Sequence, residues 1–168
     1  MKVLVCTVFF TFVMTASIFS KDKAGALPKI AISEDGIVLN EQNLKADQNV
    51  EYYQAILGDF NVKENREDGL YYTWDKLGLK LREDAKTKNI NQISLFLTIV
   101  GTSTTKSPYR GKLTIMGKDI NFSTNPSKLK NELECEQIFC AFKLDTKTVY
   151  TNLTLDKKKF QHIQIELP

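Results

Sequence analysis

Histidine and cysteine are scarce in this sequence, and their scarcity excludes much of metal and nucleophile chemistry. Its 168 residues include one histidine, His162, and three cysteines. A catalytic triad or dyad needs a nucleophile held beside a histidine, and neither a Gly-x-Ser-x-Gly segment nor a comparable cysteine setting is present. A lone histidine without clustered carboxylates does not favour a zinc or calcium site. We therefore expect no enzyme, no metal and no cofactor, and we expect His162 to face solvent on the last strand.

A large excess of charge of either sign is also missing. The chain has 23 lysines and arginines against 20 aspartates and glutamates, a formal net charge of +3, and the two signs are interspersed. The basic run Lys157-Lys158-Lys159 is too short for a nucleic-acid groove and lacks interleaved aromatic residues. This balance predicts neither a nucleic acid nor a membrane surface as a partner.

Only one apolar run approaches the length of a membrane span, and it opens the chain. Residues 3–19 follow the basic Lys2 and end in small residues before the charged Lys21. This pattern is typical of a signal peptide, which we place at residues 1–20. An uncleaved anchor is the alternative, but it needs about 20 apolar residues, and this run is short and rich in threonine. Cys6 lies at the head of the run, so it does not fit a lipid-attachment site.

Cleavage after Ser20 predicts an exported protein, periplasmic or secreted, without stable membrane insertion. Residues 21–28 form a flexible lead-in, and residues 29–168 are long enough for a single domain with one core. Outside the reducing cytosol, Cys135 and Cys140 are expected to form a disulfide. A straight strand would hold them about 16 Å apart, at roughly 3.3 Å per residue, so a bend must lie between them.

Short alternating apolar runs between turn residues predict a mostly antiparallel sheet. The predicted strands cover residues 29–33, 37–39, 69–74, 79–81, 93–100, 113–115, 120–122, 138–144, 149–155 and 160–167. A helix is predicted from the cap Asp47 to the stop Gly58, and a short second helix over residues 127–133. The charged or polar stretches that remain, residues 61–68, 82–92 and 101–111, are predicted to be connections. Together these elements predict an α+β domain with one or two helices packed on one face of the sheet.

Apolar residues of the first hairpin recur later in the chain at a constant spacing. Four of them each follow their counterpart by 83 residues, namely Leu113, Ile115, Ile120 and Phe122 after Ile30, Ile32, Ile37 and Leu39. The order hairpin, helix, strands would then occur twice, over residues 29–100 and 112–168, which predicts an internal duplication. Four matches in two hairpins can also arise by chance, so both interpretations stay open.

The hairpin of residues 69–81 contains the single tryptophan and a turn with a clear physical cause. Asp75 can bond its own backbone two residues on, and Gly78 can take a positive φ. Trp74 beside the turn can pack as a large apolar anchor while its indole N–H finds a partner near a wet loop. We expect these three residues to have a structural role.

The helix end Leu57-Gly58 and the run Tyr72-Thr73-Trp74-Asp75-Lys76-Leu77-Gly78 resemble a pattern in small uncharacterised exported bacterial proteins, some of them immunity-type partners of secreted toxins. The likeness covers roughly residues 30–100. The same features are similar to small envelope domains of outer-membrane assembly lipoproteins and of a tandem-repeat lactamase inhibitor, although this chain lacks their lipid-attachment cysteine. The resemblance supplies no catalytic residues. It implies a periplasmic immunity protein or inhibitor that neutralises a toxin or hydrolase by protein–protein contact.

The predicted binding residues lie around this hairpin. Adjacent residues of a strand point to opposite faces, so one ring of the pair Tyr71 and Tyr72 is expected to be exposed, and exposed tyrosine is favoured in recognition surfaces. Acidic side chains nearby can form a negative rim for a basic partner. The predicted site consists of Glu64, Glu67, Asp68, Tyr71, Tyr72, Tyr109 and Arg110.

Two other functions remain open at this point. One is a structural or adaptor role in the bacterial envelope. The other is a hydrolase, which would need two carboxylates held in a cleft at a set separation. The acids available for it around the hairpin are Glu64, Glu67, Asp68, Asp75, Glu83 and Asp84. A solvated surface is the usual setting of such acids.

Overall fold

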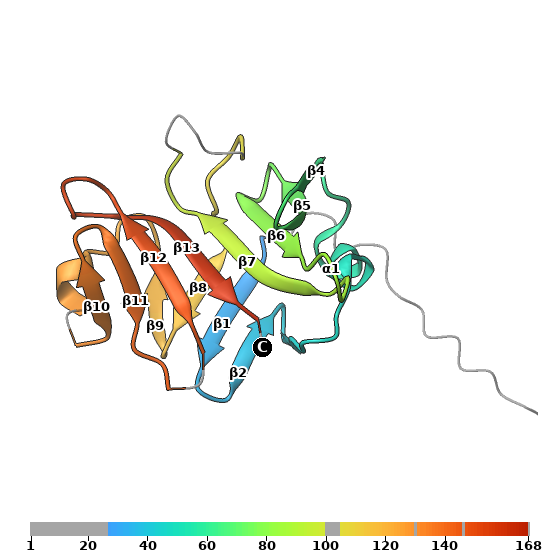
Figure 1. The fold of residues 1–168 in the computed structure, drawn as a ribbon. Helices are drawn as coiled ribbons and strands as arrows, with labels where there is room; N and C mark the ends of the chain where they lie inside the picture. The colour runs from blue at the N-terminus through green and yellow to red at the C-terminus, as the bar shows by residue number, and fades with distance from the viewer. Residues whose placement is uncertain (1–26, 100–104, 130, 146, 168) are drawn as a thin grey trace, which may run out of the picture.

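A computed structural model describes residues 27–99, 105–129, 131–145 and 147–167, and strands make up most of their regular structure (Figure 1). The strands are β1 (Lys29–Ser33), β2 (Gly36–Leu39), β3 (Gln42–Asn43), β4 (Val62–Arg66), β5 (Gly69–Trp74), β6 (Leu79–Glu83), β7 (Ile90–Phe96), β8 (Lys112–Ile115), β9 (Lys118–Ile120), β10 (Leu133–Glu136), β11 (Phe139–Phe142), β12 (Val149–Leu153) and β13 (Phe160–Glu166). The α-helix α1 covers Val50–Leu57, and the 3₁₀ turn η1 covers Pro126–Leu129. The predicted signal peptide and most of the lead-in lie outside the described residues.

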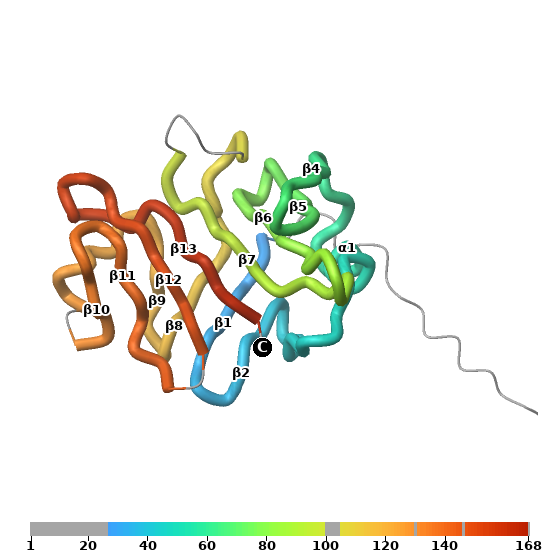
Figure 2. The backbone as a smooth tube through the Cα atoms, in the orientation of Figure 1, coloured from blue at the N-terminus to red at the C-terminus, as the bar shows by residue number. Residues whose placement is uncertain are grey.

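The strands form two sheets that pack face to face. The smaller sheet has the order β3-β2-β1-β8-β9, and the larger has the order β10-β11-β12-β13-β7-β6-β5-β4. All pairings are antiparallel except that of β1 with β8. The larger sheet lies in front of β1, β2, β8 and β9 in Figure 2, and one hydrophobic core draws its side chains from both sheets. Among the described residues no helix is long and apolar enough to span a bilayer.

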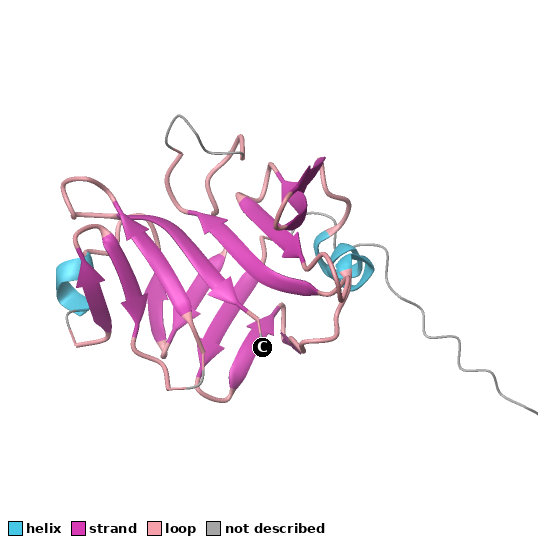
Figure 3. Cartoon of the chain, in the orientation of Figure 1, coloured by secondary structure: helices cyan, strands magenta, loops and turns pink. Residues whose placement is uncertain are grey.

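The expected α+β class is wrong, because the fold is mostly β. Strands hold 46% of the described residues and helical turns 9%. The apolar faces of the two sheets cover each other, so neither needs a layer of helices. The second predicted helix, over residues 127–133, is only the single turn η1, and its last predicted residue already opens β10. In Figure 3, α1 and η1 lie at opposite ends of the molecule rather than across a sheet face.

Several boundaries also differ from the prediction. The expected connection over residues 61–68 contains β4, and that over residues 82–92 contains the end of β6 and the start of β7. The helix begins after Asn49, whose Oδ1 accepts a hydrogen bond from the amide of Tyr52 at 3.3 Å, and not after Asp47. It ends at Gly58 as predicted, with φ 78°.

The predicted tryptophan hairpin forms and joins three segments. Its turn differs in one bond, because the amide of Leu77 donates to the carbonyl of Trp74 at 3.0 Å, whereas the Asp75 carboxylate lies 3.4 Å from the Lys106 ammonium. Trp74 is 2% exposed, and its Nε1 donates to the carbonyl of Gly58 at 2.8 Å, which ties β5 to the end of α1. Gly78 closes the turn with φ 64°, and a Cβ there would lie 2.1 Å from the amide nitrogen of Tyr109. Only glycine fits this contact, because both its backbone conformation and its lack of a side chain are required.

The two hairpins that share apolar spacing lie side by side. β1 and β8 pair in parallel with Ile30 opposite Leu113 and Ile32 opposite Ile115, so residues 83 positions apart are direct neighbours. The fourth pair, Leu39 and Phe122, differs in burial, because Leu39 is buried and Phe122 is 43% exposed. The duplication itself stays a prediction.

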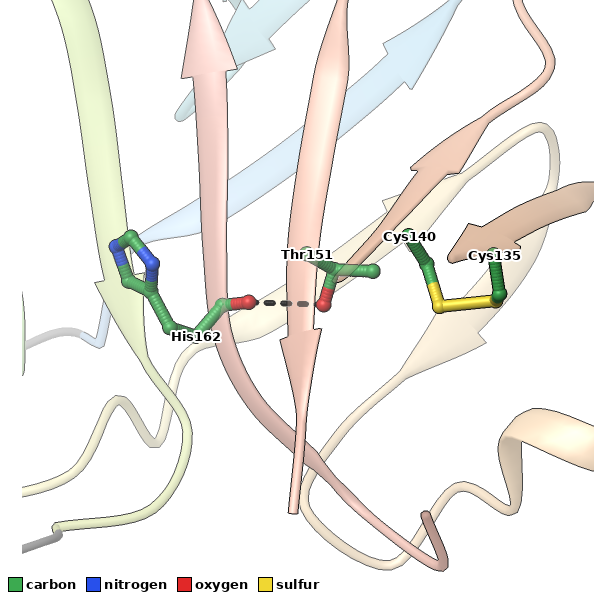
Figure 4. Close-up of a disulfide and its surroundings, with 4 residues drawn as sticks. All are labelled: Cys135, Cys140, Thr151 and His162. Atoms are coloured by element: carbon green, nitrogen blue, oxygen red, sulfur yellow. Dashed lines mark hydrogen bonds between the residues drawn. A yellow bond between two sulfur atoms is a disulfide. The ribbon is translucent and has the colours of Figure 1, made fainter. Parts of the chain in front are cut away.

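The disulfide between Cys135 and Cys140 is present. The two residues face each other on β10 and β11 with their Cα atoms 4.0 Å apart, and the chain turns between these strands (Figure 4). The bend that the spacing requires is therefore the turn of a tight hairpin.

Candidate functional site

The outer face of the eight-stranded sheet is the face turned away from the five-stranded sheet, and it carries Glu64, Asp68 and Tyr71 of the predicted binding residues. Side chains alternate along each strand, so the apolar members point to the core and the others to the outer face. No described helix or strand lies in front of β7, β12 and β13 in Figure 1. The two ends of this outer face differ in their side chains, which are mainly charged at the β4–β6 end and aromatic at the β11–β12 end.

The prediction of an exposed tyrosine at the hairpin is wrong. Tyr71, Tyr72 and Tyr109 are all buried. Tyr72 faces the core, and its hydroxyl donates to Glu83 at 2.7 Å. The hydroxyl of Tyr109 donates to the carbonyl of Pro28 at 2.7 Å. Tyr71 does lie on the outer face, but charged side chains from the neighbouring strands cover its ring.

These side chains form a charged network at the β4–β6 end, made of Glu64, Arg66, Asp68, Tyr71, Lys80 and Arg82. Glu64 accepts from Arg66 at 2.7 Å and from Lys80 at 3.4 Å. Asp68 accepts from the Tyr71 hydroxyl at 2.5 Å and lies 3.5 Å from Arg82. The Arg66 guanidinium and the Lys80 ammonium lie 4.8 and 5.1 Å from the centre of the Tyr71 ring, within cation–π range.

The network satisfies its own charges. The hydrogen bond from Arg66 lowers the pKa of Glu64, and the hydrogen bond from Tyr71 lowers the pKa of Asp68. Burial lowers the pKa of the Lys80 ammonium, whose side chain is almost fully covered. A glycosidase-type acid needs a carboxyl with a raised pKa, so these two carboxyls do not favour the hydrolase alternative. Glu67 is exposed in the turn between β4 and β5.

The other predicted residues do not join this cluster. The connections at residues 61–68 and 105–111 meet at Asp75, whose amide donates to Asn61 at 2.9 Å and whose carbonyl accepts from Ser107 at 3.1 Å. Residues 101–104 of the predicted connection at 101–111 lie outside the described residues. The Arg110 guanidinium lies 5.1 Å above the ring of Phe122, beside the five-stranded sheet. The seven predicted binding residues therefore do not form one surface.

His162 lies on the outer face as predicted, but it is half-buried rather than exposed. Its ring stacks on Phe96 with the centroids 4.9 Å apart, and Figure 4 shows it pointing from β13 toward β7, away from the disulfide. Its Nε2 is buried without a hydrogen-bond partner among the described residues. Burial, helped by the charge of Lys80, lowers the pKa of His162 to about 4, so the ring is neutral at physiological pH.

An aromatic patch occupies the opposite end of the outer face. We define it as Phe139 and Ala141 of β11 with Tyr150 of β12. Phe139 is 60% exposed and Tyr150 45% exposed. Ala141 lies directly between Tyr150 and Glu134 in the strand register, and Glu136 lies opposite Phe139. These five residues line a shallow hollow of about 390 Å³.

Sequence reasoning missed this patch, although a signal for it was present. In β12, Val149, Thr151 and Leu153 are buried, and Tyr150 lies between the first two of them, so it points the other way. In β11, Phe139 precedes the buried Cys140 and likewise points the other way. The pattern therefore places two aromatic rings on the solvent face. Nothing in the sequence alone shows that β11 and β12 are neighbours in the register that joins them.

No metal centre accompanies either cluster in the described part of the chain. Within the described ranges, no group of three or more histidine, cysteine, aspartate or glutamate side chains is placed to hold a metal ion.

Comparison with known proteins places this mostly β domain in a family. Residues 29–130 match the family described as a domain of unknown function (DUF7738), and the chain belongs to that family. No curated protein matches the chain. β10 to β13, and with them the aromatic patch, follow the matched residues.

One solved structure with a distant likeness is a cysteine-rich secretory protein from Staphylococcus aureus subsp. aureus Mu50. It is 11% identical, with a TM-score of 0.38, and the likeness covers 71% of this chain. This chain spans only 43% of that protein's length. A likeness at this level carries no argument about fold or function.

Proposed function

We propose that this protein is an exported, non-enzymatic binding protein whose aromatic patch contacts a protein partner. The observation that carries the proposal is the exposure of Phe139 and Tyr150, at 60% and 45%, on neighbouring strands. Large aromatic side chains bury much area at little cost in conformational entropy, and they are enriched among the residues that dominate binding energy. Both rings stand on paired strands, so the surface is largely formed before a partner arrives.

Export is supported by two independent features. The apolar leader has the pattern of a signal peptide, and the Cys135–Cys140 disulfide is typical of proteins that leave the reducing cytosol. The partner would then be another exported protein.

The most concrete form of the proposal is an immunity protein or inhibitor that covers the active site of a secreted toxin or hydrolase. A rigid, strand-borne surface suits this task, because tight inhibitors change little in shape when they bind. The resemblance of the tryptophan hairpin to immunity-type proteins supports the same function.

The test is capture of a partner from the exported proteins of the source organism. The wild-type chain is compared with the double variant Phe139→Ser, Tyr150→Ser and with the control Phe122→Ser, which alters an exposed aromatic ring on the other sheet. The proposal predicts one stoichiometric enzyme that the wild type and the control retain, that the double variant loses, and whose activity falls when the chain is added. Equal retention by the double variant contradicts the role of the patch, and retention of envelope components instead favours the adaptor function.

A further inference from the structure

The end strand β10 leaves one of its two backbone edges without a paired strand. Within the described residues it pairs only with β11. Natural edge strands are commonly protected by lysine, proline or a bulge, which discourage another strand from pairing. β4, at the opposite end of the sheet, carries Lys63 and Arg66. β10 has the sequence Leu-Glu-Cys-Glu and pairs in regular register, so it has no lysine, proline or bulge, and its protection consists of its short length and its two glutamates.

The backbone groups that β10 turns outward follow from the ladder. The amide of Lys143 donates to the carbonyl of Glu132 at 2.8 Å, which makes these two residues a hydrogen-bonded pair. In an antiparallel ladder such pairs alternate, so Glu134 and Glu136 bond to β11, whereas Leu133 and Cys135 turn their N–H and C=O groups to the open edge. The 4.0 Å Cα separation at the disulfide fits a pair without mutual hydrogen bonds. Cys135 is exposed, so the edge is accessible there.

The two sides of this edge have different chemistry. On the outer face stand the exposed Glu134 and Glu136, next to the aromatic patch. On the inner side, residues of β10, η1 and β12 line a hollow of about 340 Å³. Its lining contains the apolar Pro126, Leu133 and Leu153 and, at its polar side, Ser127, Gln137 and Lys157. A strand added to β10 would alternate between these two environments, because its side chains point to opposite faces in turn.

Charge decides which strand fits. A second copy of β10 would bring its own glutamates against Glu134 and Glu136, and like charges across a strand pair are destabilising. Lysine or arginine at the outward positions would instead pair with Glu136 and compete for Glu134 with Lys143, whose ammonium lies 3.6 Å from that carboxylate. Their cationic ends would lie within reach of the exposed aromatic rings. Apolar residues at the inward positions would fill the hollow beside Leu133.

We infer that a protein partner adds an extended strand of alternating basic and apolar residues to the open edge of β10. Main-chain hydrogen bonds from Leu133 and Cys135 hold the added strand, and the acidic outer side selects its sequence. This inference rests on the proposed function, because it names the kind of segment with which the partner binds.

The test uses a synthetic peptide of about six residues that alternates lysine and valine, blocked at both ends. It is titrated into the disulfide-bonded domain and followed by amide NMR shifts and hydrogen exchange. The inference predicts saturable binding that protects the amides of Leu133 and Cys135. A glutamate–valine peptide, and a lysine–valine peptide N-methylated at alternate residues, should each bind at least about tenfold more weakly, since each loses charge pairs or main-chain bonds.

Variants separate this edge from the rest of the acidic surface. Glu134→Gln with Glu136→Gln should weaken the lysine–valine peptide about fivefold to tenfold, whereas the control Glu64→Gln with Glu67→Gln should leave its affinity unchanged. Equal affinity for the acidic peptide, protection of β4 in place of β10, or an absence of saturable binding would each overturn the inference. If the peptide fails while capture of the partner still depends on Phe139 and Tyr150, only the strand addition is wrong and the proposed function stands.

Discussion

At the scale of single residues, Trp74 and its neighbours Asp75 and Gly78 connect segments that are distant in the sequence. Trp74 binds the end of α1 through Gly58, and Asp75 binds both flanking connections through its backbone. Gly78 lets the chain at Tyr109 pass in direct contact. Trp74, Asp75 and Gly78 therefore hold the neighbouring segments of the domain together, as their predicted structural role requires.

Replacing Trp74 tests how much this residue contributes to the stability of the fold. Trp74→Ala should lower the free energy of unfolding by roughly 3–5 kcal/mol, because it leaves a large cavity in the core. Trp74→Phe keeps the ring volume in part and removes the 2.8 Å bond to Gly58, so its loss should be smaller. Urea unfolding measures both. An unchanged midpoint for Trp74→Ala would show that the indole does not anchor the fold.

The lowered pKa of His162 should make the stability of the fold depend on pH, and a variant without this histidine can show its contribution. Its pKa is about 4 in the fold against 6.5 in its ordinary state, so between these values the unfolded chain binds a proton that the folded chain does not. Stability should therefore fall as the pH drops from 6.5 toward 4. The carboxyls of Glu64 and Asp68, with lowered pKa, add to the loss only below their ordinary range near pH 4.

Thermal melts at pH 7 and pH 5 check this prediction. The melting temperature should fall further between pH 7 and pH 5 for the wild type than for His162→Gln, because glutamine does not titrate in this range. Equal losses in the two proteins would mean that the imidazole is protonated in the fold and well solvated.

At the scale of elements, the sequence predicted those strands whose alternation reflects burial. β1, β2 and β12 each bury one face, and their apolar residues recur at every second position, as they also do in β13 from Ile163 onward. β4 and β10 end the sheet and bury little, so the polar sequence of β4 predicts a connection and that of β10 predicts no strand. Edge strands are set by pairing with a neighbour rather than by their own pattern, and this pairing is not visible in one sequence.

The disulfide should act on its hairpin more than on the whole domain. It closes a ring of six residues, so removing it should cost about 2 kcal/mol by the loop-entropy estimate. In the double variant Cys135→Ser, Cys140→Ser, amide exchange should rise mainly in β10 and β11, while β7 at the centre of the sheet stays protected. Hydrogen exchange followed residue by residue measures this. A uniform rise over both sheets would contradict a local role.

At the scale of the whole molecule, the outer face has two ends with opposite properties. The charged network around Tyr71 is compensated within the chain, so a partner would have to break its ion pairs before gaining new ones. The aromatic patch has no such cost, because Phe139 and Tyr150 are already exposed. The sequence predicts an aromatic surface with acidic neighbours around Tyr71 and Tyr72, whereas the exposed aromatic side chains, Phe139 and Tyr150, lie at the other end of the outer face. Charged side chains of neighbouring strands cover Tyr71, and a strand's neighbours cannot be read from its own residues.

The neutralised variant Glu64→Gln, Glu67→Gln, Asp68→Asn should therefore bind a captured partner with nearly wild-type kinetics. Glu67 and Asp68 are exposed, so any loss of stability should come mainly from Glu64→Gln, which removes the partner of the covered Lys80. Surface plasmon resonance at low and moderate salt measures the association rate. A clear slowing at low salt would show that these acids steer the partner.

The most direct test of the account compares the two ends of the face in one measurement. The dissociation rate of the captured partner is measured for the wild type, for Phe139→Ser with Tyr150→Ser, and for the neutralised variant at Glu64, Glu67 and Asp68. The account predicts that the patch variant dissociates roughly 100-fold faster, the effect of removing two central aromatic contacts, while the neutralised variant matches the wild type. Faster dissociation of the neutralised variant, with the patch variant unchanged, would contradict it.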